Sequence, residues 1–140
     1  MIVLDANVLL EAHIEGPRHR QTREWLDERL WGTARVGLPW QSLLAFLRIS
    51  TNPRVYQRPQ KLADAWAQVQ AWLACEPAWV PEPTERHAEI LEQLFAHAPV
   101  TGNLIPDAHL AAIAIGHGST LVSFDGDFAR FKGLRWQRPF

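Results

Sequence analysis

Cysteine is almost absent from this chain, which has a single one, Cys75, in 140 residues. One cysteine excludes an internal disulfide, and neither a CxxC pair nor an HxxxH spacing is present to bind zinc. We therefore expect Cys75 to be a small apolar core residue in a protein of a reducing compartment. Folds that depend on disulfides or on structural zinc are excluded.

The sequence also lacks a long apolar run and an excess of charge of either sign. No apolar stretch reaches the roughly 18 residues of a membrane span, and the first residues have neither the basic start nor the apolar stretch of a signal peptide. Lys plus Arg number 14 against 15 for Asp plus Glu, so net charge indicates no polyanionic partner. We expect a cytoplasmic protein with no membrane partner.

Short β-branched runs alternate with helical patterns along the whole chain. The predicted strands include residues 2–4, 35–38 and 120–124, and apolar residues recur at helical spacing in 18–31, 40–47, 62–73 and 106–114. Thr84 is placed to cap one later helix, and Pro106 to begin the next. This alternation predicts an α/β fold with a parallel sheet flanked by helices. No linker divides the chain, so we expect one domain, residues 1–140.

Aspartates stand where the predicted strands end. Asp5 directly follows the first strand, Asp125 and Asp127 directly follow the last long one, and Asp107 lies in the first turn of a predicted helix. In open parallel sheets, ligands bind beyond the carboxyl ends of the strands. Carboxylates that converge there repel one another unless a hard cation is present. Their oxygens suit Mg²⁺ or Mn²⁺, which in turn suit a phosphate substrate.

Each of these acids also has a purely local interpretation. Asp5 is placed to cap the next helix, and Asp107 to favour a helix N-terminus by its charge. Asp125 and Asp127 flank a glycine, which is typical of a turn. Periodicity and acids alone therefore leave several α/β folds open.

Five segments, in this order and at this spacing, resemble PIN-domain nucleases. MIVLDANVLL (1–10) is similar to their opening strand and turn, NLIPDAHLAA (103–112) to their later acidic helix, and LVSFDGDF (121–128) to their final acidic strand. FKGLRW (131–136) resembles the tail that follows, and LPWQSLLAFLRISTNP (38–53) resembles a subgroup of VapC-type toxins. The resemblance covers essentially the whole chain.

The resemblance implies a PIN-like fold, a short twisted parallel sheet flanked by helices, usually in a homodimer. It implies a Mg²⁺- or Mn²⁺-dependent endoribonuclease that acts on RNA and is inhibited by a VapB-like antitoxin. Asp5, Asp107 and Asp125 match the metal-binding acids of the family. The remaining matches are an accessory acid and two polar residues that orient carboxylates or water, namely Asp127, Asn7 and Ser123.

The helix after the second strand departs from the family pattern. PIN nucleases usually carry a glutamate about three residues before the arginine that matches Arg48, and this chain has Ala45 there. One interpretation is a site with fewer ligands, completed by Asp127 or Glu11. The alternative is a PIN-like domain that binds RNA or an antitoxin without cleaving RNA.

Several other residues invite a functional interpretation. His109 lies two positions from Asp107, so it points about 200° around the helix, and we expect a packing or surface role. Arg48 is expected to make a structural ion pair or hydrogen bond. Trp31 is a candidate for stacking on bases, and Trp40 is expected in the core or a dimer interface. The basic residues that can line an RNA backbone, or simply form a solvated face, are Arg54, Arg58 and Lys61.

Overall fold

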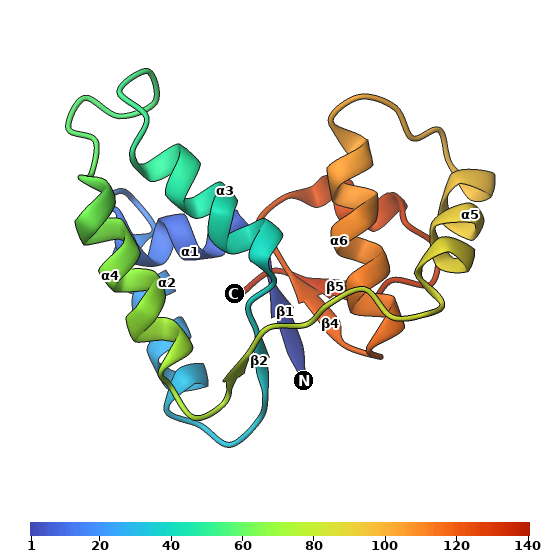
Figure 1. The fold of residues 1–140 in the computed structure, drawn as a ribbon, viewed down its shortest axis with the longest axis horizontal. Helices are drawn as coiled ribbons and strands as arrows, with labels where there is room; N and C mark the ends of the chain where they lie inside the picture. Colours follow the sequence, from blue (N-terminus) through green and yellow to red (C-terminus); the bar gives the residue numbers. More distant parts are fainter.

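The computed structural model describes all 140 residues. Its helices and strands follow in the order β1 (Ile2–Leu4), α1 (Ala6–His13), α2 (His19–Leu30), β2 (Val36–Gly37), α3 (Trp40–Ser50), α4 (Leu62–Leu73), β3 (Ala78–Trp79), α5 (His87–His97), α6 (Leu104–Gly116), β4 (Thr120–Val122), the 3₁₀ turn η1 (Gly126–Arg130) and β5 (Trp136–Gln137) (Figure 1). The predicted α/β class is confirmed. None of the helices is long and apolar enough to cross a membrane.

The strands form one five-stranded parallel sheet with the order β3-β2-β1-β4-β5. The chain builds outward from β1 through β2 to β3, and then crosses to the other side of β1 to add β4 and β5. The strand order therefore reverses between β1 and β4, where Leu4 pairs with Val122. This is the switch point at which parallel sheets bind ligands, beyond the carboxyl ends of the strands.

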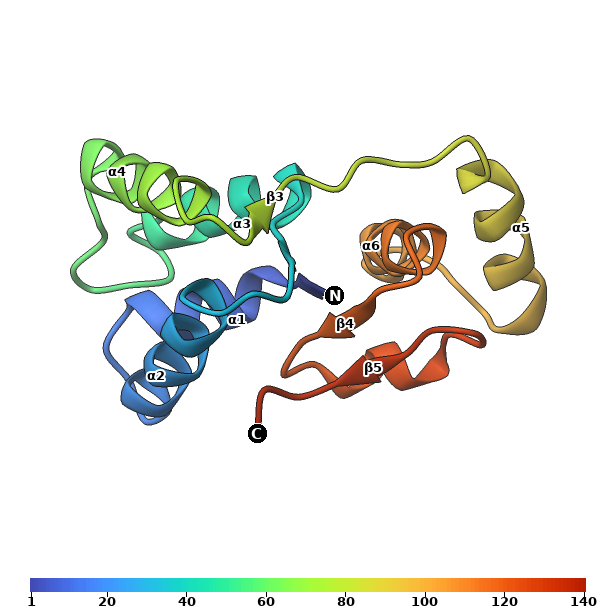
Figure 2. The same ribbon diagram turned by 90° about the horizontal axis from the view of Figure 1, so that it is seen from below.

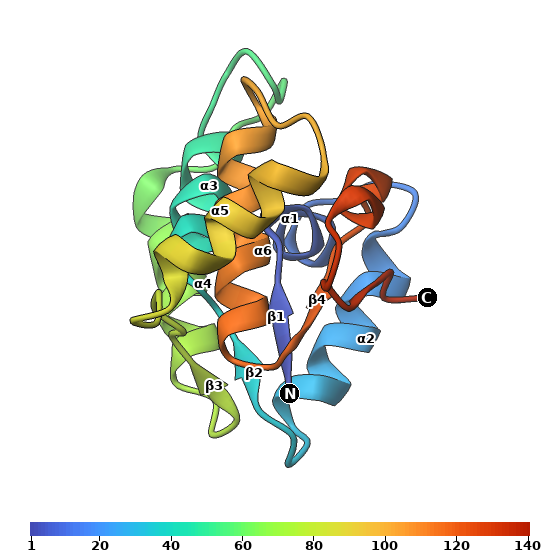
Figure 3. The same cartoon turned by 90° about the vertical axis from the view of Figure 1, so that its right-hand side faces the viewer.

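Helices cover both faces of the sheet, as Figure 2 shows. Because side chains alternate along a strand, Leu4 and Val122 pack into one apolar cluster with residues of α1, α2, α3 and α4. Val3 and Leu121 pack into the other cluster, with residues of α5, α6 and η1. Helix α6 begins at the end of the sheet where β1 and β4 finish (Figure 3). Its first turn therefore lies beside the switch point.

The beginnings of α5 and α6 differ from the sequence predictions. Helix α5 begins at His87 with Arg86 at its cap position, and Thr84 instead accepts a hydrogen bond from the Arg86 amide at 3.3 Å, in the turn before the helix. Helix α6 begins at Leu104, two residues before Pro106. A proline is tolerated there because the first four amides of a helix have no intrahelical acceptor. Helix α6 ends at Gly116, and Gly118, which has a φ of 63°, follows its C-cap residue His117.

Candidate functional site

Asp5 lies at the end of β1 and is the N-cap of α1. Its Oδ1 accepts a hydrogen bond from the Ala6 amide at 2.7 Å. Its Oδ2 accepts one from the Ser123 hydroxyl at 2.7 Å and one from the Asn7 side-chain amide at 3.2 Å. The carboxyl is buried, and burial raises its pKa against the opposing effect of the Ser123 and Ala6 hydrogen bonds. The capping interpretation of Asp5 is therefore confirmed, and its carboxylate also joins the ends of β1 and β4 through Ser123.

Asn7 and Ser123 hold the ends of β1 and β4 together. The Asn7 side chain donates to the Ser123 hydroxyl at 2.9 Å and accepts from the Phe124 amide at 3.1 Å. The Ser123 hydroxyl also accepts from the Asp125 amide at 3.0 Å, while its own proton goes to Asp5. Ser123 is completely buried. These two residues orient the Asp5 carboxylate, as the family resemblance implies.

Asp125 and Asp127 occupy the turn after β4. Asp125 is the N-cap of η1, and its Oδ1 accepts from the Asp127 amide at 2.9 Å. The Asp127 carboxylate is exposed and forms an ion pair with Arg130 at 3.3 Å. The turn interpretation therefore also holds for this pair of acids. Because Asp127 is already paired with a cation, it is the weaker of the two as a metal ligand.

Asp107 lies in the first turn of α6, and its pKa is affected by the other three acids. Burial and the neighbouring carboxylates of Asp5, Asp125 and Asp127 raise its pKa to about 6, and Arg130 opposes the shift. The other three predicted acids thus all act on Asp107, beside the switch point between β1 and β4. Repulsion between neighbouring carboxylates is typical of a site where a bound cation would offset their negative charge.

The acidic side chains lie farther apart than these effects on the pKa of Asp107 suggest. No group of three or more Asp, Glu, His or Cys side chains is close enough to hold a metal ion by itself. Coulombic coupling acts over several ångströms, whereas direct ligation needs about 2 Å for Mg²⁺, so both observations stand. Mg²⁺ commonly binds through one or two carboxylates and keeps several waters. The oxygen-only donor set therefore fits a hydrated hard cation rather than a fully enclosed one.

The first turn of α3 contributes two residues that the sequence analysis missed. The Ser42 hydroxyl donates to the Leu4 carbonyl at 2.7 Å, directly before Asp5. The Gln41 side-chain amide donates to the Pro106 carbonyl at 2.8 Å, directly before Asp107. Two polar residues at the start of an otherwise apolar helix that follows a predicted strand were the available signal.

Two other residues of the sequence analysis do not serve the site as suggested. The Glu11 carboxylate pairs with Arg18 at 3.0 Å, and Glu11 is not among the charges that act on Asp5 or Asp107. Arg48 is exposed and forms neither an ion pair nor a side-chain hydrogen bond, so its expected structural role is wrong.

His109 packs away from the acids. Its Nδ1 lies 2.9 Å from Nε2 of His87 on α5, with the two rings edge to face. Burial and the proximity of His109 lower the pKa of His87. The packing role expected for His109 is confirmed.

The two candidate tryptophans lie on different surfaces. Trp31 is 87% exposed and sits just before β2, at the amino edge of the sheet, opposite the acids. It therefore cannot stack on a base held at the acidic site. Trp40 is 41% exposed and stacks on Trp66 of α4 with ring centroids 6.4 Å apart, so it lies outside the core.

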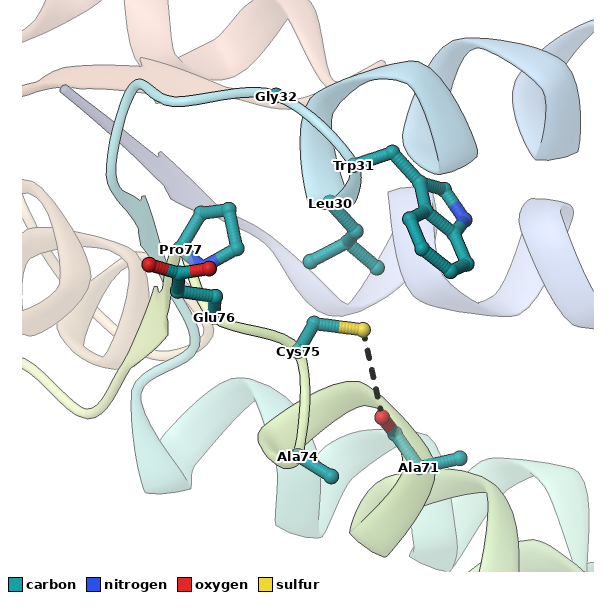
Figure 4. Close-up of a pocket in the computed structure, with 8 residues that line it drawn as sticks. All are labelled: Leu30, Trp31, Gly32, Ala71, Ala74, Cys75, Glu76 and Pro77. Carbon is teal, nitrogen blue, oxygen red and sulfur yellow. Dashed lines mark hydrogen bonds between the residues drawn. The ribbon is translucent and has the colours of Figure 1, made fainter.

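Trp31 borders an apolar hollow of about 310 Å³ between the ends of α2 and α4 (Figure 4). Leu30, Ala71 and Cys75 contribute to its lining, and the Cys75 thiol donates to the Ala71 carbonyl at 3.5 Å. None of the site acids reaches it. This hollow is therefore separate from the acidic site.

Comparisons with known proteins agree with this architecture. The family model "PIN domain" matches residues 2–134. Ribonuclease VapC37 of Mycobacterium tuberculosis is 44% identical over 140 residues, which cover 99% of this chain and 97% of the relative. Ribonuclease VapC25 of the same species is 42% identical over 141 residues, covering 99% of each chain.

Solved structures share the fold at lower identity. The VapBC2 complex of Rickettsia felis contains a chain with a TM-score of 0.70 and 16% identity, with 99% of this chain and 98% of that chain covered. VapC20 of M. tuberculosis, described as a toxin that cleaves the sarcin-ricin loop, has a TM-score of 0.66 and 18% identity, with coverages of 96% and 99%. The predicted PIN-like fold is thus confirmed. The chain belongs to the PIN-domain family and, within it, to the VapC ribonucleases.

Proposed function

We propose that this protein is an endoribonuclease toxin of a VapBC-type toxin–antitoxin pair, which hydrolyses RNA phosphodiester bonds with Mg²⁺ or Mn²⁺. The observation that carries the proposal is the coupling of Asp107 to Asp5 and Asp125 at the sheet's switch point. It occurs in a chain that is 44% identical to a ribonuclease over nearly its whole length. We assign all 140 residues to one cytoplasmic PIN domain.

Asp5, Asp107 and Asp125 are the residues that would hold the cation. When bound, a divalent cation polarises the phosphodiester and stabilises the charge that develops in the transition state. Ser123 and Asn7 fix one Asp5 oxygen by hydrogen bonds, which leaves further lone pairs on that carboxylate for a ligand. Because Ser123 donates its only hydroxyl proton to Asp5, it is not poised as a nucleophile, and we assign that role to water.

Two adjoining hollows lead from Asn7, beside Asp5, toward the basic loop between α3 and α4, and Glu11 and Glu15 also line them. A hollow of about 260 Å³ extends from Asn7 to Tyr56, and Tyr56 also lines a neighbouring hollow of about 480 Å³ that reaches Arg58. Basic side chains bind RNA phosphates without reading sequence, and aromatic rings stack on bases. We assign this path to the RNA strand, with Arg54, Arg58 and Lys61 beside it.

Two exposed apolar surfaces suit protein partners. Trp40 and Trp66 stack on the outer face of α3 and α4, where Leu44 and Leu62 are also exposed. Contiguous exposed apolar side chains of this kind mark protein interfaces, and we assign this face to the second copy of a homodimer. We assign the hollow beside Trp31 to the VapB-like antitoxin, because an exposed tryptophan beside an apolar hollow is a typical anchor.

One observation favours a second candidate, a PIN domain that binds RNA without cleaving it. Helix α3 has Ala45 where the family usually has a glutamate, and no three ligand side chains are gathered closely. A protein of this kind would retain RNA affinity in EDTA and would cut no RNA in any metal.

The deciding experiment is cleavage of total cellular RNA by the antitoxin-free chain with Mg²⁺, Mn²⁺ or EDTA. We expect discrete fragments in the presence of either metal, and none in EDTA or with Asp107→Asn. Asp64→Asn, in the first turn of α4, is the matched control and should cleave as the native chain does. RNA that stays intact under every condition, although it binds the folded protein, would establish the second candidate.

A further inference from the structure

The Gln41 side chain is held in place at the acidic site by one of its two polar atoms. Its Nε2 donates to the Pro106 carbonyl at 2.8 Å. A carbonyl oxygen can only accept hydrogen bonds, so the amino group must face Pro106, which fixes the orientation of the amide. The free end of the side chain is therefore its oxygen, Oε1.

That oxygen is buried and has no hydrogen-bond partner. Buried polar atoms are nearly always paired in folded proteins, and an exception calls for a ligand, a water or an ion. Here the unpaired atom is an amide oxygen, which is a donor that hard divalent cations and their waters accept readily. It belongs to a residue that is bonded to the neighbour of Asp107.

The first turn of α3 is attached to both halves of the acidic site. Ser42 bonds the carbonyl before Asp5, and Gln41 bonds the carbonyl before Asp107. Gln41 and Ala45 lie four residues apart and thus on the same face of the helix. Helix α3 carries no acid, and the Ser42 hydroxyl is bonded to the Leu4 carbonyl, so Gln41 is the side chain of this turn whose oxygen is left without a partner.

We propose, on the basis of the function proposed above, that Gln41 supplies the α3 oxygen of the divalent-cation site. Gln41 then acts on the cation directly or through one of its waters, with Oε1 as the acceptor. It takes the place that Ala45 leaves without a ligand. An amide is neutral, so the site holds one negative charge fewer than it would with a carboxylate in this position.

The test is calorimetric titration of the antitoxin-free chain with Mn²⁺ in the absence of RNA. Gln41→Met, which keeps the length of the side chain but has no oxygen, should weaken Mn²⁺ binding about 10-fold. Gln41→Glu keeps an oxygen and adds a charge, but cannot donate to Pro106; it should bind Mn²⁺ at least as tightly as the native chain. Gln70→Met, on the exposed face of α4, is the control and should change nothing.

The variants separate the competing outcomes. Gln41→Glu binding as weakly as Gln41→Met would show that Gln41 only ties α3 to α6, and would overturn the proposal. Unchanged binding by a folded Gln41→Met would overturn it as well. Asp107→Asn serves as the reference for the site itself. If it loses Mn²⁺ while Gln41→Met does not, the inference about Gln41 fails alone, whereas native binding by Asp107→Asn would refute the proposed acidic site.

Discussion

Neutralising Asp107 should stabilise the metal-free protein. The pKa of this carboxyl is raised from 3.8 to about 6, so the folded chain disfavours its charged form. One pKa unit corresponds to about 1.4 kcal/mol, which gives an upper limit of about 3 kcal/mol for Asp107→Asn above pH 7. Because the side chain is only partly buried, solvent screening reduces this to about 1 kcal/mol.

A second effect of the same substitution acts in the opposite direction. The negative charge of Asp107 favours the N-terminus of α6, and its loss costs about 0.5 kcal/mol. The net gain is therefore about 0.5 kcal/mol, or about 1 to 3 °C in Tm for a domain of this size. Asp64→Asn removes an exposed acid from the first turn of α4, where only the second effect applies. Asp64→Asn, the control variant, should therefore lower Tm slightly.

The pH dependence makes the reasoning testable. Well below pH 3.8, Asp107 is protonated in the folded and unfolded states, so Asp107→Asn should give no advantage. As pH rises from 3.8 to about 6, the unfolded chain ionises Asp107 while the folded chain keeps it protonated, so the native chain loses stability that the variant keeps. The loss is complete above pH 6. The assay is thermal unfolding followed by circular dichroism in EDTA from pH 3 to 8. A variant that is less stable than the native chain at pH 7.5, or a difference independent of pH, would refute the convergence of the acids.

Three further predictions follow from individual contacts. Ser123→Ala should lower the free energy of unfolding by about 1 to 3 kcal/mol in chemical denaturation, because it leaves Asn7 and the Asp125 amide without a buried acceptor. It should also reduce cleavage of RNA. A variant as stable as the native chain would contradict the hydrogen-bond network. Gly118→Ala should cost about 1 kcal/mol, because φ is 63° and no side chain blocks the position; a neutral effect in the same assay would contradict the left-handed cap. Trp66→Ala, on the face assigned to the homodimer, should shift sedimentation from dimer to monomer. An unchanged dimer would show that the interface lies elsewhere.

The carboxyl edge of the sheet was predictable because it depends on chain order and local pattern. Asp5 and Asp125 follow short apolar strands, and parallel strands place their carboxyl ends together whatever covers them. Asn7 and Ser123 came from the family resemblance, and their hydrogen bonds confirm that they lie between these strand ends. This part of the site depends on neighbouring strands alone.

The part built by α3 was not predictable, because it depends on a contact between distant segments. Gln41 meets Pro106 across 65 residues of sequence, and no periodicity in either segment indicates the other. Trp40 shows the same limit. Its spacing places it on the apolar face of α3, yet stacking on Trp66 of the next helix leaves it partly exposed. Apolar spacing shows which face is apolar, but not whether the same chain or a partner covers it.

Some acids of the proposed site also cap a helix. A variant tests catalysis best when its substitution removes the charge without removing a cap. Asp5 caps α1, and Asp125 caps η1, in addition to facing the site. Asp5→Ala would remove a cap worth about 1 kcal/mol and would also leave Ser123 without its acceptor. Lost cleavage in that variant would not separate a missing ligand from a loosened strand end. Asp107 caps nothing and accepts no side-chain bond, so Asp107→Asn removes the charge from a fold that should become more stable. An inactive protein with a raised Tm would place Asp107 in the chemistry.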